Sequence, residues 1–123
     1  MVLAALTAKI ISKESMQQLL DNLLSAILKR TTSLGKNGPI QIILFGSAAR
    51  NQASVYSDID VLIVVKRLIE IRPTIRLLSG LSCELNCALD IIVVDEEQFK
   101  RKREVGGVFF DAWNQGVILF EKE

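Results

Sequence analysis

The chain has 123 residues, of which 50% are apolar and 24% charged, a composition that suits one globular domain and excludes a disordered or fibrous chain. Fifteen basic and fourteen acidic residues leave a formal net charge of +1, so no global field draws the chain to nucleic acid or to membranes. The apolar stretch at 1–8 is interrupted by Lys9, short of a signal peptide or a membrane span. We therefore expect one cytoplasmic domain over residues 1–123.

The first predicted element is an amphipathic helix over about 12–31. Apolar side chains recur at helical spacing between residues 15 and 30, and Lys29 and Arg30 stand at the far end, where the helix dipole favours cations. Ser15 and Gln18 have the spacing of a capping box, which predicts that the helix begins near Ser15.

Short apolar runs and further helices follow this helix. A GKNGP turn precedes the first run, Pro73 is well placed to open a helix, and Gly80 weakens that helix. The sequence predicts strands at 40–45, 58–65, 88–94 and 117–121, and helices at 73–86, 95–104 and 106–116. This order indicates an α+β fold, in which a small mixed sheet is flanked by helices.

Acidic residues at the beginning of two predicted strands require an explanation. Side chains alternate across a strand, so Asp58 and Asp60 lie on one face while Ile59 lies on the other. Asp90 opens the next strand in the same way. Adjacent like charges raise a pKa or require a cation, and a hard divalent ion prefers oxygen ligands. Each aspartate alone could be a solvated turn residue, but together they predict a two-metal carboxylate cluster.

A glycine-serine turn follows the first strand. Gly46 lets the backbone come close to a ligand, and the Ser47 hydroxyl and the following amides can meet phosphate oxygens if GSAAR begins a helical turn. Arg50 lies one turn further on, where its guanidinium could neutralise phosphate charge. Alone this turn is a weak indication of phosphate binding, and the acidic pair makes it specific.

Three other patterns receive structural interpretations. Cys83 and Cys87 are the only cysteines and no histidine is present, so we expect two reduced thiols that pack on a helix as small apolar groups. The basic run at 100–103 is surrounded by acidic residues and predicts the solvated end of a charged helix, so nucleic acid is not an expected partner. The aromatic residues of 108–113 are interpreted as core, with a partner contact as the alternative.

The residues from 45 to 65 resemble a known family. Gly46-Ser47, ten further residues and Asp58-Ile59-Asp60 reproduce the G-S-x(10)-D-x-D signature of the DNA polymerase β-like nucleotidyltransferase superfamily. The setting FGSAAR…SDIDVLIVV resembles its minimal nucleotidyltransferase (MNT) branch, and the likeness extends over a catalytic core of about 38–121. The resemblance implies the polymerase β-like fold.

The resemblance also implies roles for the matching residues. Asp58, Asp60 and Asp90 would hold two magnesium ions, with manganese as the alternative, and Asp90 is placed to take the proton from an attacking hydroxyl. Gly46 and Ser47 would hold the phosphates of ATP. Transfer of AMP would proceed by in-line attack on the α-phosphorus, with pyrophosphate leaving.

The partner implied by the MNT branch is a separate helical HEPN protein. The two would form a toxin-antitoxin pair in which the MNT protein transfers AMP to the toxin. The N-terminal helix and the aromatic segment at 108–113 are the candidate contact surfaces. Two alternatives remain open: a binding module that neutralises a HEPN partner by contact alone, and nucleotidyl transfer to a small molecule or an RNA end. The sequence also leaves self-association open.

Overall fold

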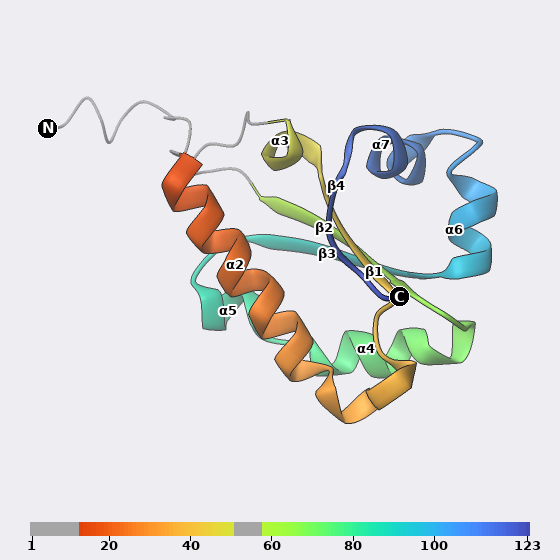
Figure 1. Ribbon diagram of the computed structural model, residues 1–123, viewed down its shortest axis with the longest axis horizontal. Helices are drawn as coiled ribbons and strands as arrows, with labels where there is room; N and C mark the ends of the chain where they lie inside the picture. The colour runs from red at the N-terminus through yellow and green to blue at the C-terminus, as the bar shows by residue number, and fades with distance from the viewer. Residues whose placement is uncertain (1–12, 51–57) are drawn as a thin grey trace, which may run out of the picture.

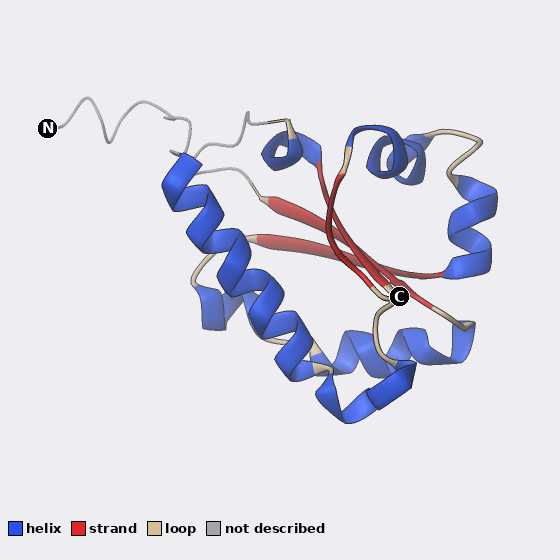
Figure 2. Cartoon of the chain, viewed as in Figure 1, coloured by secondary structure: helices blue, strands red, loops and turns tan. Residues whose placement is uncertain are grey.

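The computed structural model describes residues 13–50 and 58–123, so the apolar stretch at 1–8 lies outside the described residues. A mixed sheet of four strands has helices on both faces, which confirms the α+β class (Figure 1). Figure 2 shows the strands crossing the middle of the molecule between the helices. No helix in the two described ranges is long and apolar enough to cross a membrane.

The elements follow the predicted order. The strands are β1 (Gln41–Phe45), β2 (Ile59–Val65), β3 (Leu89–Asp95) and β4 (Val117–Glu121). The α-helices are α2 (Lys13–Arg30), α3 (Gly46–Ala49), α4 (Ile71–Leu77), α5 (Leu81–Leu85), α6 (Glu96–Lys102) and α7 (Gly107–Gln115). Two 3-10 helices are present in the described ranges, η1 (Thr32–Asn37) and η2 (Leu68–Glu70).

The strand order β3-β2-β1-β4 brings the start of β2, the start of β3 and the end of β1 to one edge of the sheet. Strand β1 is antiparallel to β2 and β4, whereas β2 and β3 are parallel. In this register Asp60 stands opposite Phe45 on one side and opposite Asp90 on the other. The last residue of β1, just before the glycine-serine turn, is therefore level with both aspartates.

Both faces of the sheet are covered by apolar side chains. One face of β1 and β2 packs against Leu23 and Ile27 of α2 and against the region of α4 and α5. The opposite face packs against Phe99 of α6 and Ala112 of α7. Because β1 and β2 are apolar on both faces, as the sequence predicted, the polar residues at their ends stand out as exceptions.

The predicted helix at 73–86 is two helices in the structure. Gly80, at φ +83°, adopts a left-handed conformation between α4 and α5, which a glycine accepts without steric cost. Pro73 is the third residue of α4, within the first turn, where its missing N–H has no helical acceptor to lose. Helix α2 already includes Lys13 and Glu14, so the prediction that it begins with Ser15 as its cap is wrong.

Both cysteines are free, as predicted, but they do not share a helix. Cys83 lies in α5 and is exposed, so the prediction that it packs as an apolar group is wrong. Asn86, in the left-handed conformation at φ 52°, ends α5 before Cys87. Burial raises the pKa of the half-buried Cys87 thiol, which keeps the thiol protonated.

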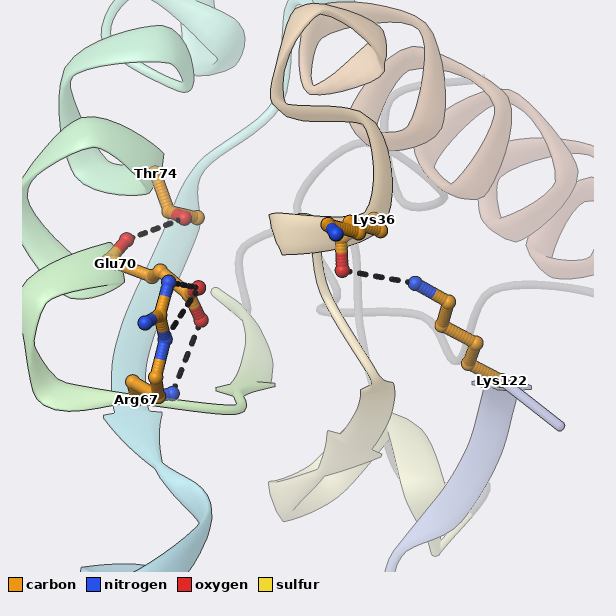
Figure 3. Close-up of polar contacts among 5 residues, drawn as sticks. All are labelled: Lys36, Arg67, Glu70, Thr74 and Lys122. Atoms are coloured by element: carbon orange, nitrogen blue, oxygen red, sulfur yellow. Dashed lines mark hydrogen bonds and ion pairs between the residues drawn. The ribbon is translucent and has the colours of Figure 1, made fainter.

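A buried carboxylate fixes the crossover that follows β2. Glu70 is 5% exposed and accepts hydrogen bonds from Nε and Nη2 of Arg67 at 3.1 and 3.0 Å and from the Arg67 backbone at 3.0 Å (Figure 3). The Thr74 hydroxyl donates to the backbone oxygen of Glu70 at 2.8 Å, which ties η2 to α4. Figure 3 also shows Lys122 donating to the backbone oxygen of Lys36, 3.0 Å away, beyond the end of β4.

Gly116 provides a test of the packing between α7 and β1. A Cβ atom at this position would collide with the Ala112 backbone oxygen of α7 and would lie 2.6 Å from Ile43 Cγ2 and 3.0 Å from the Leu44 backbone oxygen, although the backbone conformation itself is ordinary. We expect Gly116→Ala to lower the free energy of unfolding by about 1–3 kcal/mol, as overpacked cores do. Urea unfolding measures this change. The exposed neighbour substitution Gln115→Ala is the control, and equal stability of the two variants would contradict this packing.

Candidate functional site

The candidate site lies at the edge of the sheet where β2 and β3 begin. Asp60 is the second residue of β2 and is half-buried, on the face that continues with Leu62 and Val64 under α6 and α7. Asp90 is its register partner on β3 and is exposed. Asp58 precedes β2 and is also exposed. The structure thus brings together the aspartates that the sequence singled out.

The neighbouring carboxylates affect the ionisation of Asp60. Burial raises the pKa of the Asp60 carboxyl above its usual value, and the negative charges of Asp90, Asp58 and Asp111 raise it further, in that order. Among the described residues, the positive charge of Arg50 lowers this pKa. A carboxylate in such surroundings gains from any cation that enters the site.

The glycine of the predicted turn is required by Asp60 itself. Gly46 has φ +73°, a conformation that L side chains rarely adopt. A Cβ atom there would lie 3.2 Å from Asp60 Cγ and would collide with Oδ2 of the same carboxyl group. The carboxylate therefore lies directly against the backbone of the turn. The GSAAR segment does begin a helical turn, α3, as the interpretation of Gly46 and Ser47 required.

Arg50 caps the C-terminal end of α3 and reaches across to α7. Its Nη1 lies 3.7 Å from Asp111 Oδ1, and the two side chains are 40% and 35% exposed. Asp111 was not identified from the sequence, because a lone acidic residue in an aromatic helical segment carries no recognisable pattern. It is the only acidic residue in α7, and the packing of α7 beside α3 places it at the site.

The donor set of the site fits a hard divalent cation. Asp58, Asp60 and Asp90 offer only carboxylate oxygens, the ligands that magnesium prefers. Within residues 13–50 and 58–123, no three acidic or cysteine side chains are gathered closely enough to coordinate one ion as they stand.

The basic run at 100–103 largely forms the solvated end of α6, as predicted. Lys100 and Arg101 are exposed and pair with acids one turn earlier, at 3.6 and 3.9 Å. Arg103 differs, because its guanidinium stacks on the Trp113 ring with 3.7 Å to the centroid. This cation–π contact holds the end of α6 against α7.

The aromatic residues of α7 divide between core and surface. Phe109 packs edge-on against the buried Phe99, as the interpretation of this segment as core requires. Phe110 and Trp113 are 47% and 42% exposed, so the interpretation as core is wrong for Phe110 and only partly right for Trp113. Exposed apolar side chains therefore lie on the same helix as Asp111.

Comparison with known proteins adds a sequence match and fold matches. Residues 24–107 match the family described as "Nucleotidyltransferase domain", and this range contains all six residues predicted for the site. The Methanocaldococcus jannaschii protein named "Putative protein adenylyltransferase MJ1305" is 40% identical over 52 residues, which are 42% of this chain. The aligned part is 35% of that protein, so the chain matches about a third of its relative's length.

Two solved structures share the fold. A Sulfolobus solfataricus structure, described as a putative nucleotidyltransferase, superposes with a TM-score of 0.57 at 24% identity, covering 88% of this chain and 85% of that one. A chain from the complex of tri-AMPylated Shewanella oneidensis HEPN toxin with MNT antitoxin gives a TM-score of 0.50 at 19% identity, covering 87% and 73%. At these identities the likeness concerns the fold alone.

The raised pKa of Asp60 predicts a stabilising substitution. The folded protein binds this proton more tightly than the unfolded chain does, so stability is lost as the pH rises through the interval between the two pKa values. We expect Asp60→Asn to raise the melting temperature by about 3 °C at pH 7 in the absence of metal, and hardly at all at pH 3. Calorimetry at both pH values measures this. A lower melting temperature at pH 7 would contradict the assigned environment.

Proposed function

Because the chain belongs to the nucleotidyltransferase domain family, we propose that it transfers a nucleoside monophosphate, AMP from ATP, to a hydroxyl group of a partner protein. The observation that carries the proposal is the position of the Asp60 carboxylate, which lies against the Gly46 turn and in register with Asp90. Phosphate-binding backbone and metal-binding carboxylates are then in contact, as transfer from a triphosphate requires.

Each aspartate has a role in this proposal. Asp58, Asp60 and Asp90 would hold two magnesium ions, with manganese as the alternative. Bound there, the metal would offset the charge of the triphosphate and of the departing pyrophosphate. Asp90 is exposed at the edge of the sheet, so an acceptor hydroxyl can approach it and give up its proton to the carboxylate.

The turn and its arginine would bind the nucleotide. Gly46 and the amides after it present backbone to the phosphates, and the Ser47 hydroxyl adds a donor. Arg50 lies between Asp60, whose pKa it lowers, and Asp111, with which it pairs at 3.7 Å. From this position its guanidinium can bind a phosphate oxygen while it remains anchored by Asp111.

A protein acceptor is proposed from the surface beside the site. Phe110 and Trp113 of α7 and Val117 and Ile118 of β4 are between 42% and 49% exposed, and α7 also carries Asp111. Because Asp111 pairs with Arg50, a partner that covered the exposed side chains of α7 would lie on the helix that borders the site. The M. jannaschii relative's name and the S. oneidensis complex support a protein acceptor of the HEPN type, with this chain as the antitoxin.

A second candidate function is neutralisation of such a partner by contact alone. The exposed apolar side chains of α7 and β4 favour it, because they could bind a partner without any chemistry. The two functions differ in what a substitution of the carboxylates does. Transfer requires the aspartates, whereas contact does not.

The double substitution Asp58→Asn, Asp60→Asn separates these functions. We expect it to abolish transfer, by at least about a hundredfold, because both carboxylates that would hold the metal lose their charge. The measurement is incubation with α-labelled ATP and magnesium, with the helical protein that co-purifies, followed by detection of label on that protein. Glu97→Gln is the matched control, since Glu97 is an exposed carboxylate on α6, away from the site.

Two results would contradict the proposed transfer. Label that persists in the double variant would show that the assigned carboxylates are not required. No label with any nucleotide, together with a complex that forms equally well with the variant, would show that the protein acts by contact alone.

A further inference from the structure

A second surface of exposed apolar side chains lies over η2 and α4. Leu68, Ile69 and Ile75 are 65%, 74% and 52% exposed, which is unusual for neighbouring aliphatic side chains. A cavity of about 400 Å³ opens between Leu68, Ile69, Ile71 and Arg72. We call the exposed side chains of residues 66–76 the η2–α4 surface.

The exposed charged side chains of residues 66–76 are all basic, and Lys66 is already paired with Glu96 of α6 at 2.9 Å. Glu70 is the only acidic residue between positions 66 and 76, and it is buried and bound by Arg67. Arg72 and Arg76 are exposed, and neither forms an ion pair with any described acidic side chain. The chain as a whole has a net charge of only +1, so this concentration of positive charge is local.

Helix α4 presents these groups together. Thr74 and Leu78 are 0% and 5% exposed and pack inward, so the opposite side of α4 faces outward. Arg72, Ile75 and Arg76 share that outward side, at positions three and four residues apart. Two guanidinium groups thus lie beside an exposed aliphatic side chain, the combination of anchor and charge that recurs in protein interfaces.

The η2–α4 surface is not a wall of the candidate site. Strand β2 begins with the residues beside Asp60 and ends at Val65, shortly before η2. The surface therefore lies at the opposite end of β2 from the aspartates, as the position of α4 relative to α3 in Figure 1 also shows. A ligand bound there would leave the aspartates accessible.

The chemistry of the η2–α4 surface distinguishes among the ligands that could bind to it. A second copy that docked through the same surface would bring two arginine-bearing surfaces together, and like charges oppose that contact. Nucleic acid would gain charge contacts but would leave three aliphatic side chains with neither a stacking partner nor an apolar one. An acidic protein segment with an apolar side chain would pair with the arginines, cover the exposed aliphatic side chains and fill the cavity.

We propose that the η2–α4 surface binds an acidic, amphipathic segment of a partner protein. An apolar side chain of that segment enters the cavity beside Ile69, and its carboxylates pair with Arg72 and Arg76. This binding does not depend on nucleotide transfer, so it holds whether the candidate site is active or not. In combination with the α7 and β4 contact it would give the chain two points of attachment to its partners.

The test uses a short fluorescein-labelled helical peptide with leucine at helical spacing and glutamate at every charged position. We expect it to bind the wild-type protein, and we expect Arg72→Glu and Ile69→Ser each to weaken binding by about tenfold or more. Lys102→Glu and Val105→Ser are the controls, because they make the same kind of charge reversal and apolar-to-polar change at exposed positions outside the surface, and they should bind as the wild type does. Circular dichroism checks that every variant is folded.

Further probes distinguish the kind of partner. The same peptide with lysine in place of glutamate should not bind, and chemical-shift changes on addition of the acidic peptide should centre on residues 66–76. The proposal is overturned if the acidic peptide does not bind or if Arg72→Glu binds it equally well. It is also overturned if phosphatidylserine vesicles or a single-stranded RNA bind at residues 66–76 and the peptide does not.

Discussion

The structure of the candidate site depends on one unfavourable arrangement, a half-buried carboxylate among like charges. Asp60 begins the row of side chains that continues with buried Leu62 and Val64, so moving it outward would disturb the register of the central strand. Its pKa is raised by burial and by Asp90, Asp58 and Asp111. Groups with perturbed pKa values are found more often at functional sites than elsewhere, which supports the proposed role of Asp60.

The surrounding elements reduce the free-energy cost of this half-buried carboxylate without removing it. Gly46 lets the carboxylate lie against backbone, where a side chain would collide with it. Arg50 supplies the positive charge nearby, and Asp111 holds Arg50 from the other side. The groups come from β2, the β1–α3 turn and α7, which meet because β1 is paired with β2 and packs beside α7. The topology of the sheet thus assembles a site that no single segment contains.

The sequence predicted the strands and the acidic edge because both leave periodic or spaced signals. Runs that are apolar on both faces identified the strands of the sheet, and the turn at Gly46 followed from its place after such a run. The break at Gly80 was only suggested, since propensity cannot decide whether a glycine bends a helix or ends it. Asp111 and the exposure of Phe110 depend on how α7 lies against the sheet. This packing is tertiary structure, which leaves no local pattern in the sequence.

The pairing of β4 with β1 has a consequence for synthesis of the chain. Gln41 of β1 bonds to Glu121 of β4, so a central strand gains its second neighbour only from residues made about eighty positions later. The segment 107–121 carries both that neighbouring strand and Asp111. On the ribosome, the β2–β3 pair can therefore form while the anchor of Arg50 is still missing. Until segment 107–121 has packed against β1, Arg50 lacks its partner on α7, so the proposed nucleotide-binding turn would be completed only by the last helix and strand.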